Sequence, residues 1–236
     1  MVKLPSILEM LQAGAHFGHQ TIRRHPKMNK FIFAKRNSIN IINLEKTQEE
    51  LEKTLAFVSK LASEGKNILF VTSKPQAREI VKKYAIDCDM PYLVDRWLGG
   101  LITNFTEIKK LLDKYRSLKE QRASGELEKY TKKEQVNFKK QIEKMDKNLA
   151  GLEKIQKIPD AIFVPALQNE KTAVTEAIKM NVPVIGIADT NANPDKADFV
   201  IPANDDAISS IEMMVKLVAE AVKEGSAKQE KVIGKK

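Results

Sequence analysis

The chain of 236 residues contains a single cysteine, Cys88. One cysteine cannot form a disulfide within the chain, and it cannot build a multi-cysteine zinc site. Because disulfides accumulate in oxidising compartments, this composition predicts a cytosolic protein or one inside an organelle. Long apolar runs are missing as well, since no segment approaches the ~20 apolar residues that a membrane helix needs. We therefore expect no membrane partner.

Glycine-rich phosphate loops are also missing from the sequence. Neither the dinucleotide-binding pattern GxGxxG nor the P-loop pattern GxxxxGK[ST] occurs in it. The one Gly-Gly pair, Gly99-Gly100, lies in the stretch 95–105, which also holds the only tryptophan, Trp97. A glycine pair allows the chain to change direction sharply. Asn104 follows as a predicted helix N-cap, with a glutamate three residues later in the capping-box position.

Short apolar runs alternate with helical patterns along most of the chain. The runs are 68–71, 92–94, 161–164, 184–188 and 199–201, and each is typical of a strand buried on both faces. Strand–helix alternation of this kind predicts a parallel sheet covered on both sides. The predicted fold class is α/β, with a doubly wound, mostly parallel, five-stranded Rossmann-like sheet. Two more apolar runs, 31–33 and 39–42, predict a small hairpin with a basic tip.

Between the second and third predicted strands lies a lysine-rich segment, 104–157. Apolar residues recur in it at heptad spacing along two stretches, which predicts two helices with facing seams. We interpret the segment as an inserted antiparallel coiled-coil helical hairpin, called the arm below. Residues 1–103 and 158–225 would form the α/β globular domain, and residues 226–236 a flexible basic tail. The arm holds 15 Lys or Arg and 9 Asp or Glu, so it carries six of the nine net positive charges.

Positive charge dominates the whole chain, with 40 Lys and Arg against 31 Asp and Glu. Such an excess can simply keep a protein soluble, but it also favours polyanionic partners such as nucleic acid. The basic N-terminal loop and hairpin contain no acidic residue, and scattered basic loops with a projecting arm suit folded RNA. We predict RNA contacts by Arg23, Arg24, Lys27, Lys30, Lys35, Arg36, Arg96, Lys109, Lys110, Lys132 and Lys133, because Arg and Lys bind phosphates.

The predicted strand ends allow a second interpretation, an enzyme of the phosphate- or nucleotide-binding α/β class. Ligands of doubly wound sheets bind at the carboxyl ends of the strands, where this chain offers Ser73, Lys74, Asp95 and Asp189. Ser73 and Lys74 could hold one phosphate at a helix start. A capped strand-to-helix turn explains the same two residues more simply. We therefore predict no catalytic residue, no cofactor and no small-molecule substrate.

The three histidines of the chain could form a metal site. His16, His19 and His25 all lie in the basic N-terminal loop, and Asp189 or Asp205 could complete a set that would prefer zinc. Histidines in such a loop more often pack or bind phosphates. The predicted site therefore includes no metal ligand, although the sequence leaves this question open.

Five stretches of the chain, taken in order, resemble one family. They are 14–21, 26–28, 96–100 with 103–105, 189–191 and 201–207. They look like the signature stretches of the second small-subunit ribosomal protein, in its bacterial and organellar form. The match runs from about residue 8 to residue 224, and five motifs in register are far more specific than any one of them.

The resemblance implies a Rossmann-like domain with a coiled-coil arm and a non-catalytic role in translation, within the small ribosomal subunit. Its implied partners are small-subunit rRNA and neighbouring ribosomal proteins, including the large one built of repeated oligonucleotide-binding domains. The implied location is a cytoplasmic or organellar ribosome; an RNA-binding regulator outside the ribosome is a weaker alternative. Signature residues with a structural role would be His16, Phe17, His19, Trp97, Gly99, Gly100, Asn104, Asp189, Asn191, Asn204, Asp205 and Asp206.

Overall fold

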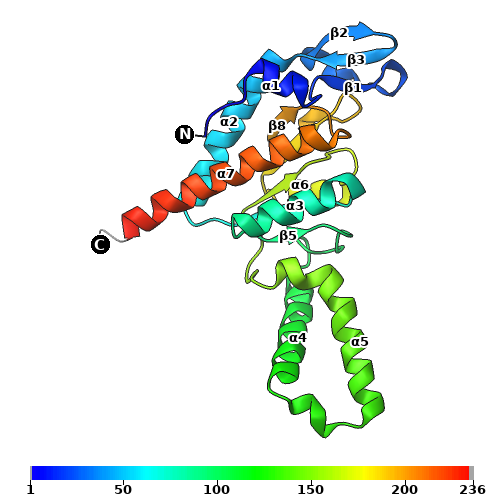
Figure 1. Cartoon of the computed structure of the whole chain (residues 1–236), viewed down its shortest axis with the longest axis vertical. Helices are drawn as coiled ribbons and strands as arrows, with labels where there is room; N and C mark the ends of the chain where they lie inside the picture. The colour runs from blue at the N-terminus through cyan, green and yellow to red at the C-terminus, as the bar shows by residue number, and fades with distance from the viewer. Residues whose placement is uncertain (1, 234–236) are drawn as a thin grey trace.

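Five short strands form a parallel sheet at the centre of the molecule, in the order β5-β4-β6-β7-β8 (Figure 1). Their bounds are Ile68–Val71 (β4), Tyr92–Leu93 (β5), Ala161–Val164 (β6), Val184–Ala188 (β7) and Phe199–Pro202 (β8). Every neighbouring pair is parallel, which confirms the predicted five-stranded α/β fold. The structure is a computed structural model, and it describes residues 2–233.

Helices cover both faces of this sheet. They are α1 (Ile7–Gln12), α2 (Leu44–Ser63), α3 (Pro75–Asp87), α6 (Lys171–Lys179) and α7 (Ile208–Ile233). Alternate residues of a strand point to opposite faces, so Ile68 and Phe70 join a buried cluster with α2, α3 and α7. Leu69 and Val71 join a second cluster, with α6. The strands are apolar throughout because both of their faces are buried.

A small antiparallel sheet lies at the end of the molecule opposite the arm (Figure 1). Its strands are Phe17–Gln20 (β1), Ile32–Arg36 (β2) and Ile39–Ile42 (β3), in the order β1-β3-β2. The β2–β3 hairpin is as predicted, but β1 falls where the sequence predicts a loop. β1 contains polar residues and pairs in an irregular register, so its sequence shows no strand periodicity. Two 3-10 helices, Thr21–Arg23 (η1) and Pro26–Phe31 (η2), join β1 to β2.

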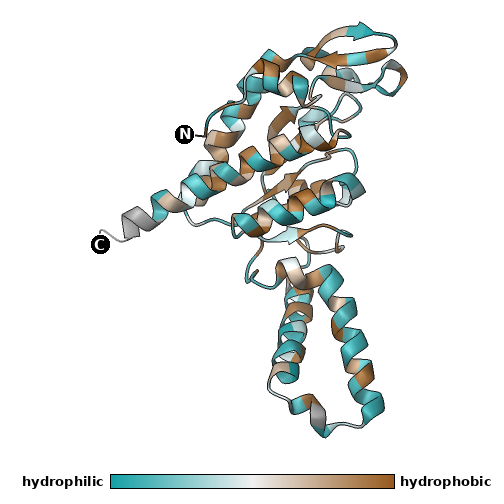
Figure 2. Ribbon diagram, in the orientation of Figure 1, coloured by the Kyte–Doolittle hydropathy of each residue, from teal (hydrophilic) through white to brown (hydrophobic). Residues whose placement is uncertain are grey.

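The arm is a pair of helices inserted between β5 and β6, the second and third parallel strands, as predicted. Its helices are Phe105–Ala123 (α4) and Lys132–Leu149 (α5), with the short 3-10 helices Glu126–Lys129 (η3) at its tip and Ala150–Leu152 (η4) at its base. The helices run side by side, and apolar residues recur along a mostly hydrophilic ribbon (Figures 1 and 2). Coiled-coil packing along the arm stays a prediction.

The inner turns of the arm are part of the core of the body. Leu112 and Tyr115 on α4 and Leu149 on α5 share the buried cluster that lies under α6. Farther out, Leu118 and Ile142 belong to a separate small cluster at the tip. The base of the arm therefore packs on the body, where Tyr115 of α4 also donates to Asp146 of α5, and a separate small cluster lies farther out.

The C-terminal helix is longer than the sequence indicates. Residues 226–233 are helical as part of α7, where we predicted a flexible tail; residues 234–236 lie outside the described part of the chain. Just before this extension α7 passes close to α2, since a Cβ added at Gly225 would lie 2.3 Å from the carbonyl oxygen of Ser59. Of the helices that the structure describes, none combines the length and the apolar character needed to cross a membrane.

Candidate RNA-binding surface and the neighbouring charged cluster

The six predicted cations between residues 23 and 36 belong to η1, η2, β2 and the turns that join them. Arg23, Lys27, Lys30, Lys35 and Arg36 are exposed, and Arg24 is half-buried. Among the described residues, only Lys27 of these six has an ion-pair partner, Asp195 at 2.5 Å. The other five form no ion pair with a carboxylate of the described chain. Phosphate groups are suitable partners for such a surface.

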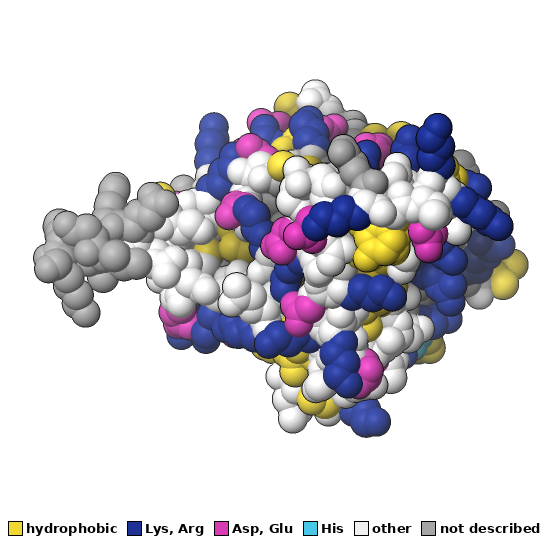
Figure 3. Space-filling view, turned by 90° about the horizontal axis from the view of Figure 1, so that it is seen from below, with side chains coloured by type: hydrophobic (Ala, Val, Ile, Leu, Met, Phe, Trp, Pro, Cys, Tyr) yellow, Lys and Arg dark blue, Asp and Glu magenta, His cyan; other side chains and the backbone are white. Residues whose placement is uncertain are grey.

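The remaining predicted cations lie away from the small sheet. Arg96 is exposed after β5, Lys109 and Lys110 are exposed on α4, and Lys132 and Lys133 are exposed in the first turn of α5. Seen from the end that carries the arm, Lys and Arg side chains are spread over the molecule, with Asp and Glu between them (Figure 3). The structure thus distributes the predicted cations over the small sheet, the strand ends and the arm, and does not gather them in one groove.

A compact cluster of charged side chains lies where β1 meets the strand ends of the large sheet. The Lys74 ammonium donates to the carboxylates of Asp205 at 2.8 Å and Asp206 at 2.7 Å. The His19 ring places Nδ1 3.0 Å from the carboxylate of Asp189 and Nε2 3.4 Å from that of Asp206. β1, the start of α3 and the turns after β7 and β8 therefore meet through charged groups.

Burial and charge oppose each other in this cluster. Burial disfavours the charge on Lys74, but hydrogen bonds to Asp205 and Asp206 raise its pKa overall. Burial raises the pKa of Asp205, and the neighbouring negative charge of Asp189 raises it further. The hydrogen bond to Asp189 raises the pKa of His19. The carboxylates around Lys74 and His19 thus favour the charged form of each of these groups.

The same cluster has the residue types of a metal site. His19, Asp189, Asp205 and Asp206 each offer a ligand atom, and these atoms lie within 4.8 Å of one another. Imidazole and carboxylate groups are ligands for divalent cations such as zinc. In this structure the Lys74 ammonium supplies positive charge to two of the three carboxylates.

The other two histidines of the considered metal set lie outside the cluster. His16 packs against Phe17, with ring centroids 3.9 Å apart, and burial lowers the pKa of its imidazole. The His25 ring accepts a hydrogen bond from the backbone N–H of Lys27 at the start of η2. Of the three histidines considered, only His19 lies in one cluster with Asp189 and Asp205, and His16 and His25 do not join it.

The Asn-Asp turns fix the backbone around the cluster. The side-chain oxygen of Asn204 accepts from the N–H groups of Asp206 at 2.8 Å and Ala207 at 3.2 Å, just before α7 begins. Asp189 accepts from the backbone N–H of His19 at 3.2 Å, which ties β1 to the end of β7. Asn191 is half-buried beside Asp189. These signature residues thus hold the small sheet against the large one.

Glu176, on α6, anchors the stretch 95–105, and the sequence did not indicate this role. Its carboxylate accepts the indole N–H of Trp97 and the backbone N–H of Gly100, both at 2.9 Å, and the hydroxyl of Thr103 at 3.1 Å. Burial opposes its charge, but these hydrogen bonds lower its pKa overall. No spacing in the sequence connects Glu176 with the stretch 95–105, which lies more than 70 residues earlier.

The stretch 95–105 itself is only partly as predicted. Gly100 has the positive φ, +86°, that favours glycine, whereas a Cβ at Gly99 would meet nothing within 4 Å. Asn104 occupies the N-cap of α4, but its side chain makes no capping hydrogen bond. The predicted capping box is therefore wrong, and the Glu176 carboxylate fixes this turn instead.

The groups that favoured an enzyme are occupied by the protein itself. Ser73 donates its backbone N–H and its hydroxyl to Glu170, the latter at 2.5 Å. Lys74 is bound to its carboxylates, and Asp95 lies 3.3 Å from the Arg78 guanidinium. A phosphate at the start of α3 would have to displace these internal contacts. Ser73 and Lys74 thus serve a structural turn, but the predicted cap is wrong, because Lys74 at the N-cap of α3 makes no side-chain capping hydrogen bond.

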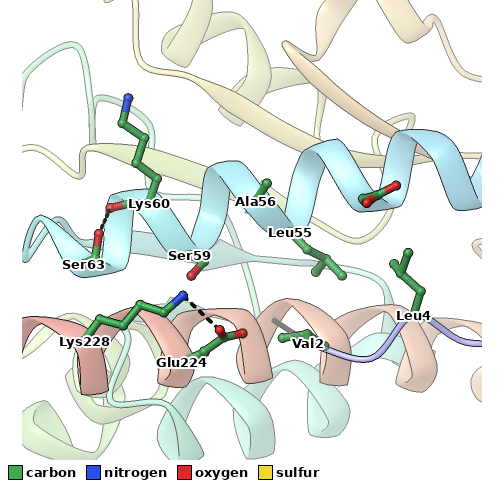
Figure 4. A pocket seen from close by; sticks show the side chains of 10 residues that line it. Val2, Leu4, Leu55, Ala56, Ser59, Lys60, Ser63, Glu224 and Lys228 are labelled. Atoms are coloured by element: carbon green, nitrogen blue, oxygen red, sulfur yellow. Dashed lines mark hydrogen bonds and ion pairs between the residues drawn. The ribbon is translucent and has the colours of Figure 1, made fainter.

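A separate cavity of about 330 Å³ lies between α2 and α7 (Figure 4). Val2, Leu4 and Leu55 give it an apolar wall, and the ion pair between Lys228 and Glu224, at 2.9 Å, lies at its edge. The cavity is on the helical side of the body, away from the small sheet and from the strand ends. It therefore takes no part in the surface described above.

The comparison with known families agrees with this combination of fold and charge. A basic α/β body with an inserted helical arm is what the resemblance to small-subunit ribosomal proteins implied. The family model described as ribosomal protein S2 matches residues 10–225, nearly the whole chain. The chain therefore belongs to the ribosomal protein S2 family. Membership implies a structural, non-enzymatic component of the small ribosomal subunit that acts in translation.

Proposed function

We propose that the chain binds small-subunit rRNA through phosphate contacts, chiefly from the small sheet and its loops. One observation carries this proposal. Residues 23–36 contain six predicted cations, and five of them have no ion-pair partner among the described residues. Unpaired cations bind phosphates without first breaking an internal ion pair. Exposed lysines on both arm helices extend the positive surface away from the body, so that it can follow the shape of a folded RNA.

Neighbouring ribosomal proteins are the second class of partner in this proposal. Three large apolar side chains of the small sheet and its loop are exposed, namely Phe17 (48%), Ile22 (93%) and Phe33 (75%). Large apolar side chains exposed on one small sheet and its loop favour contact with another protein. They support a role in docking a neighbour such as the large protein built of oligonucleotide-binding domains. The ribosome would be cytoplasmic, with an organellar one as the alternative.

Co-sedimentation with small ribosomal subunits that lack this protein tests the proposal. The full-length chain should pellet with the subunits at moderate salt and be released as salt is raised, because counterion release drives phosphate binding. The double variant Lys35→Ala/Arg36→Ala should be released at lower salt. Lys60→Ala, which removes an exposed charge on α2, is the matched control and should behave as the parent. Failure of the parent chain to pellet would contradict the proposal.

A further inference from the structure

The two central strands mark the place where a doubly wound sheet keeps a ligand. If the five strands are numbered 1 to 5 in the order in which they follow along the chain, their order across the sheet is 2-1-3-4-5. The helix after β4 packs on one face and the helix after β6 on the other, so a crevice opens at the carboxyl ends of these two strands. A cavity of about 360 Å³ lies there. Ligand sites in proteins have volumes of roughly 300–1,000 Å³.

One wall of this cavity is aromatic. Trp97 follows β5, and the hydrogen bond from its indole N–H to Glu176, at 2.9 Å, fixes the orientation of the ring. An aromatic side chain held in this way is a stacking surface for a flat ligand, and bases of unpaired RNA stack on such rings. The wall is therefore prepared for a ligand before the ligand arrives.

The lining of the cavity also includes a carboxylate, that of Glu170. Glu170 is 4% exposed, and its Oε1 accepts both hydrogen bonds from Ser73. Within residues 2–233, no donor is bound to its Oε2. Oε2 is not one of the buried side-chain atoms that lack a partner, so it is open to solvent and can accept a hydrogen bond from water or from a ligand. The neighbouring Asn169 lines the cavity too, and its amide adds a donor and an acceptor that no described side chain uses.

We propose that this cavity binds an unpaired RNA base, with guanine as the preferred one. Guanine presents two neighbouring N–H donors on its Watson–Crick edge, which match a carboxylate oxygen and an amide oxygen; uracil has a single donor there, N3–H, between two carbonyl oxygens. The base stacks on Trp97, and exposed Arg96 at the rim neutralises a flanking phosphate. The inference rests on the RNA binding proposed above and names the part of the RNA that this site recognises.

The fluorescence of Trp97 reports on this cavity directly, because it is the only tryptophan. We would titrate the full-length chain with the pentamers UUGUU and UUUUU and with free GMP. UUGUU should quench Trp97 saturably and bind at least about tenfold more tightly than UUUUU, since a hydrogen bond to a charged group is worth about that much. GMP should bind more weakly than UUGUU; equal binding would still support a guanine site and would make the free nucleotide its ligand.

Two variants separate this pocket from general RNA binding. Asn169→Ala and Glu170→Gln should each reduce the preference for UUGUU about tenfold. Because Glu170 also binds Ser73, circular dichroism should check that the Glu170→Gln variant is folded. If that variant unfolds, Asn169→Ala, at an exposed residue, tests the pocket by itself. The matched control Lys35→Ala should weaken both pentamers equally and keep their ratio.

The outcomes distinguish the two proposals. Equal quenching by both pentamers, or a guanine preference that survives both variants, would overturn the pocket. Filter retention of the same pentamers measures total RNA binding independently of Trp97. If retention persists while the guanine preference is absent, the phosphate-contact proposal stands without the pocket. If retention is also lost, both proposals are wrong.

Discussion

The indole N–H of Trp97 donates to the carboxylate of Glu176 at 2.9 Å, across 79 positions of sequence. The same carboxylate also receives the backbone N–H of Gly100 and two groups of Thr103. One side chain of α6 therefore fixes the loop from which the arm begins. The loop needs this anchor because Asn104 contributes no side-chain cap to α4.

Replacing Glu176 tests the importance of this anchor. Glu176→Ala should lower the free energy of unfolding by about 1–3 kcal/mol, because it leaves several donors of a half-buried loop unpaired. Glu176→Gln keeps one acceptor oxygen and should cost less. Urea unfolding followed by Trp97 fluorescence measures both variants. An Ala variant as stable as the parent would show that water replaces the carboxylate without loss.

Acid should weaken the same anchor. The folded pKa of Glu176 is lowered from its ordinary value of 4.5, so its contribution to stability is present above that value and is lost as the pH falls through the lowered folded pKa. The Trp97 environment of the parent should therefore change at acid pH. Glu176→Gln should lack this part of the pH dependence. Identical acid profiles of stability for parent and variant would contradict the assignment.

Removing single cations from residues 23–36 should change the salt dependence of RNA binding. Each phosphate contact contributes about one unit to the slope of log affinity against log salt, so Arg23→Ala or Lys30→Ala should lower that slope by about one. The loss should be similar for RNAs of different sequence. Binding isotherms at four salt concentrations give the slope. Lys60→Ala should leave it unchanged, and an unchanged slope for all six predicted cations would refute the surface.

The arm should have two regions of different stability. Tyr115 is fully buried at its base and its hydroxyl donates to Asp146, so Tyr115→Ala should lower global stability by about 3–5 kcal/mol. Ile142→Ala alters only the outer cluster and should loosen the tip while the body keeps its unfolding temperature. Hydrogen exchange resolves the two regions. Equal global losses in both variants would show that the arm and the body unfold as one unit.

The sequence predicted the fold better than it predicted the contacts of the candidate site. Runs such as Ile68–Val71 and Ala161–Val164 are apolar because both faces of the sheet are buried, and this pattern is local. β1 and the Glu176 anchor depend on contacts between distant segments, which no local period reveals. The same limit explains the histidines: only His19 reaches Asp189, because β1 places it there. Side-chain exposure in the structure supports the predicted cations as surface residues, but their RNA contacts remain predictions.

The last prediction concerns Asp189, which links the small sheet to the large one. Its carboxylate is 1% exposed and accepts from the backbone N–H of His19 at 3.2 Å and from the His19 ring at 3.0 Å. Asp189→Ala should therefore cost roughly 1 kcal/mol or more, from donors left without a partner. The loss is partly offset, because Asp189 raises the pKa of Asp205 and its removal relieves that repulsion. Asp189→Asn, which keeps one acceptor oxygen, should lose less.

Hydrogen exchange locates the effect of Asp189→Ala. Protection should fall first in β1, at His19 and its neighbours, while β6 and β7 stay protected. Assembly into small subunits should weaken in step with that loss, because β1 helps to hold the cationic loop in place. A different outcome would contradict the structural interpretation of this cluster. Asp189→Ala would leave β1 fully protected and the stability unchanged, yet abolish a saturable micromolar site for nucleotides, sugar phosphates or zinc. The strand ends would then have a chemical role.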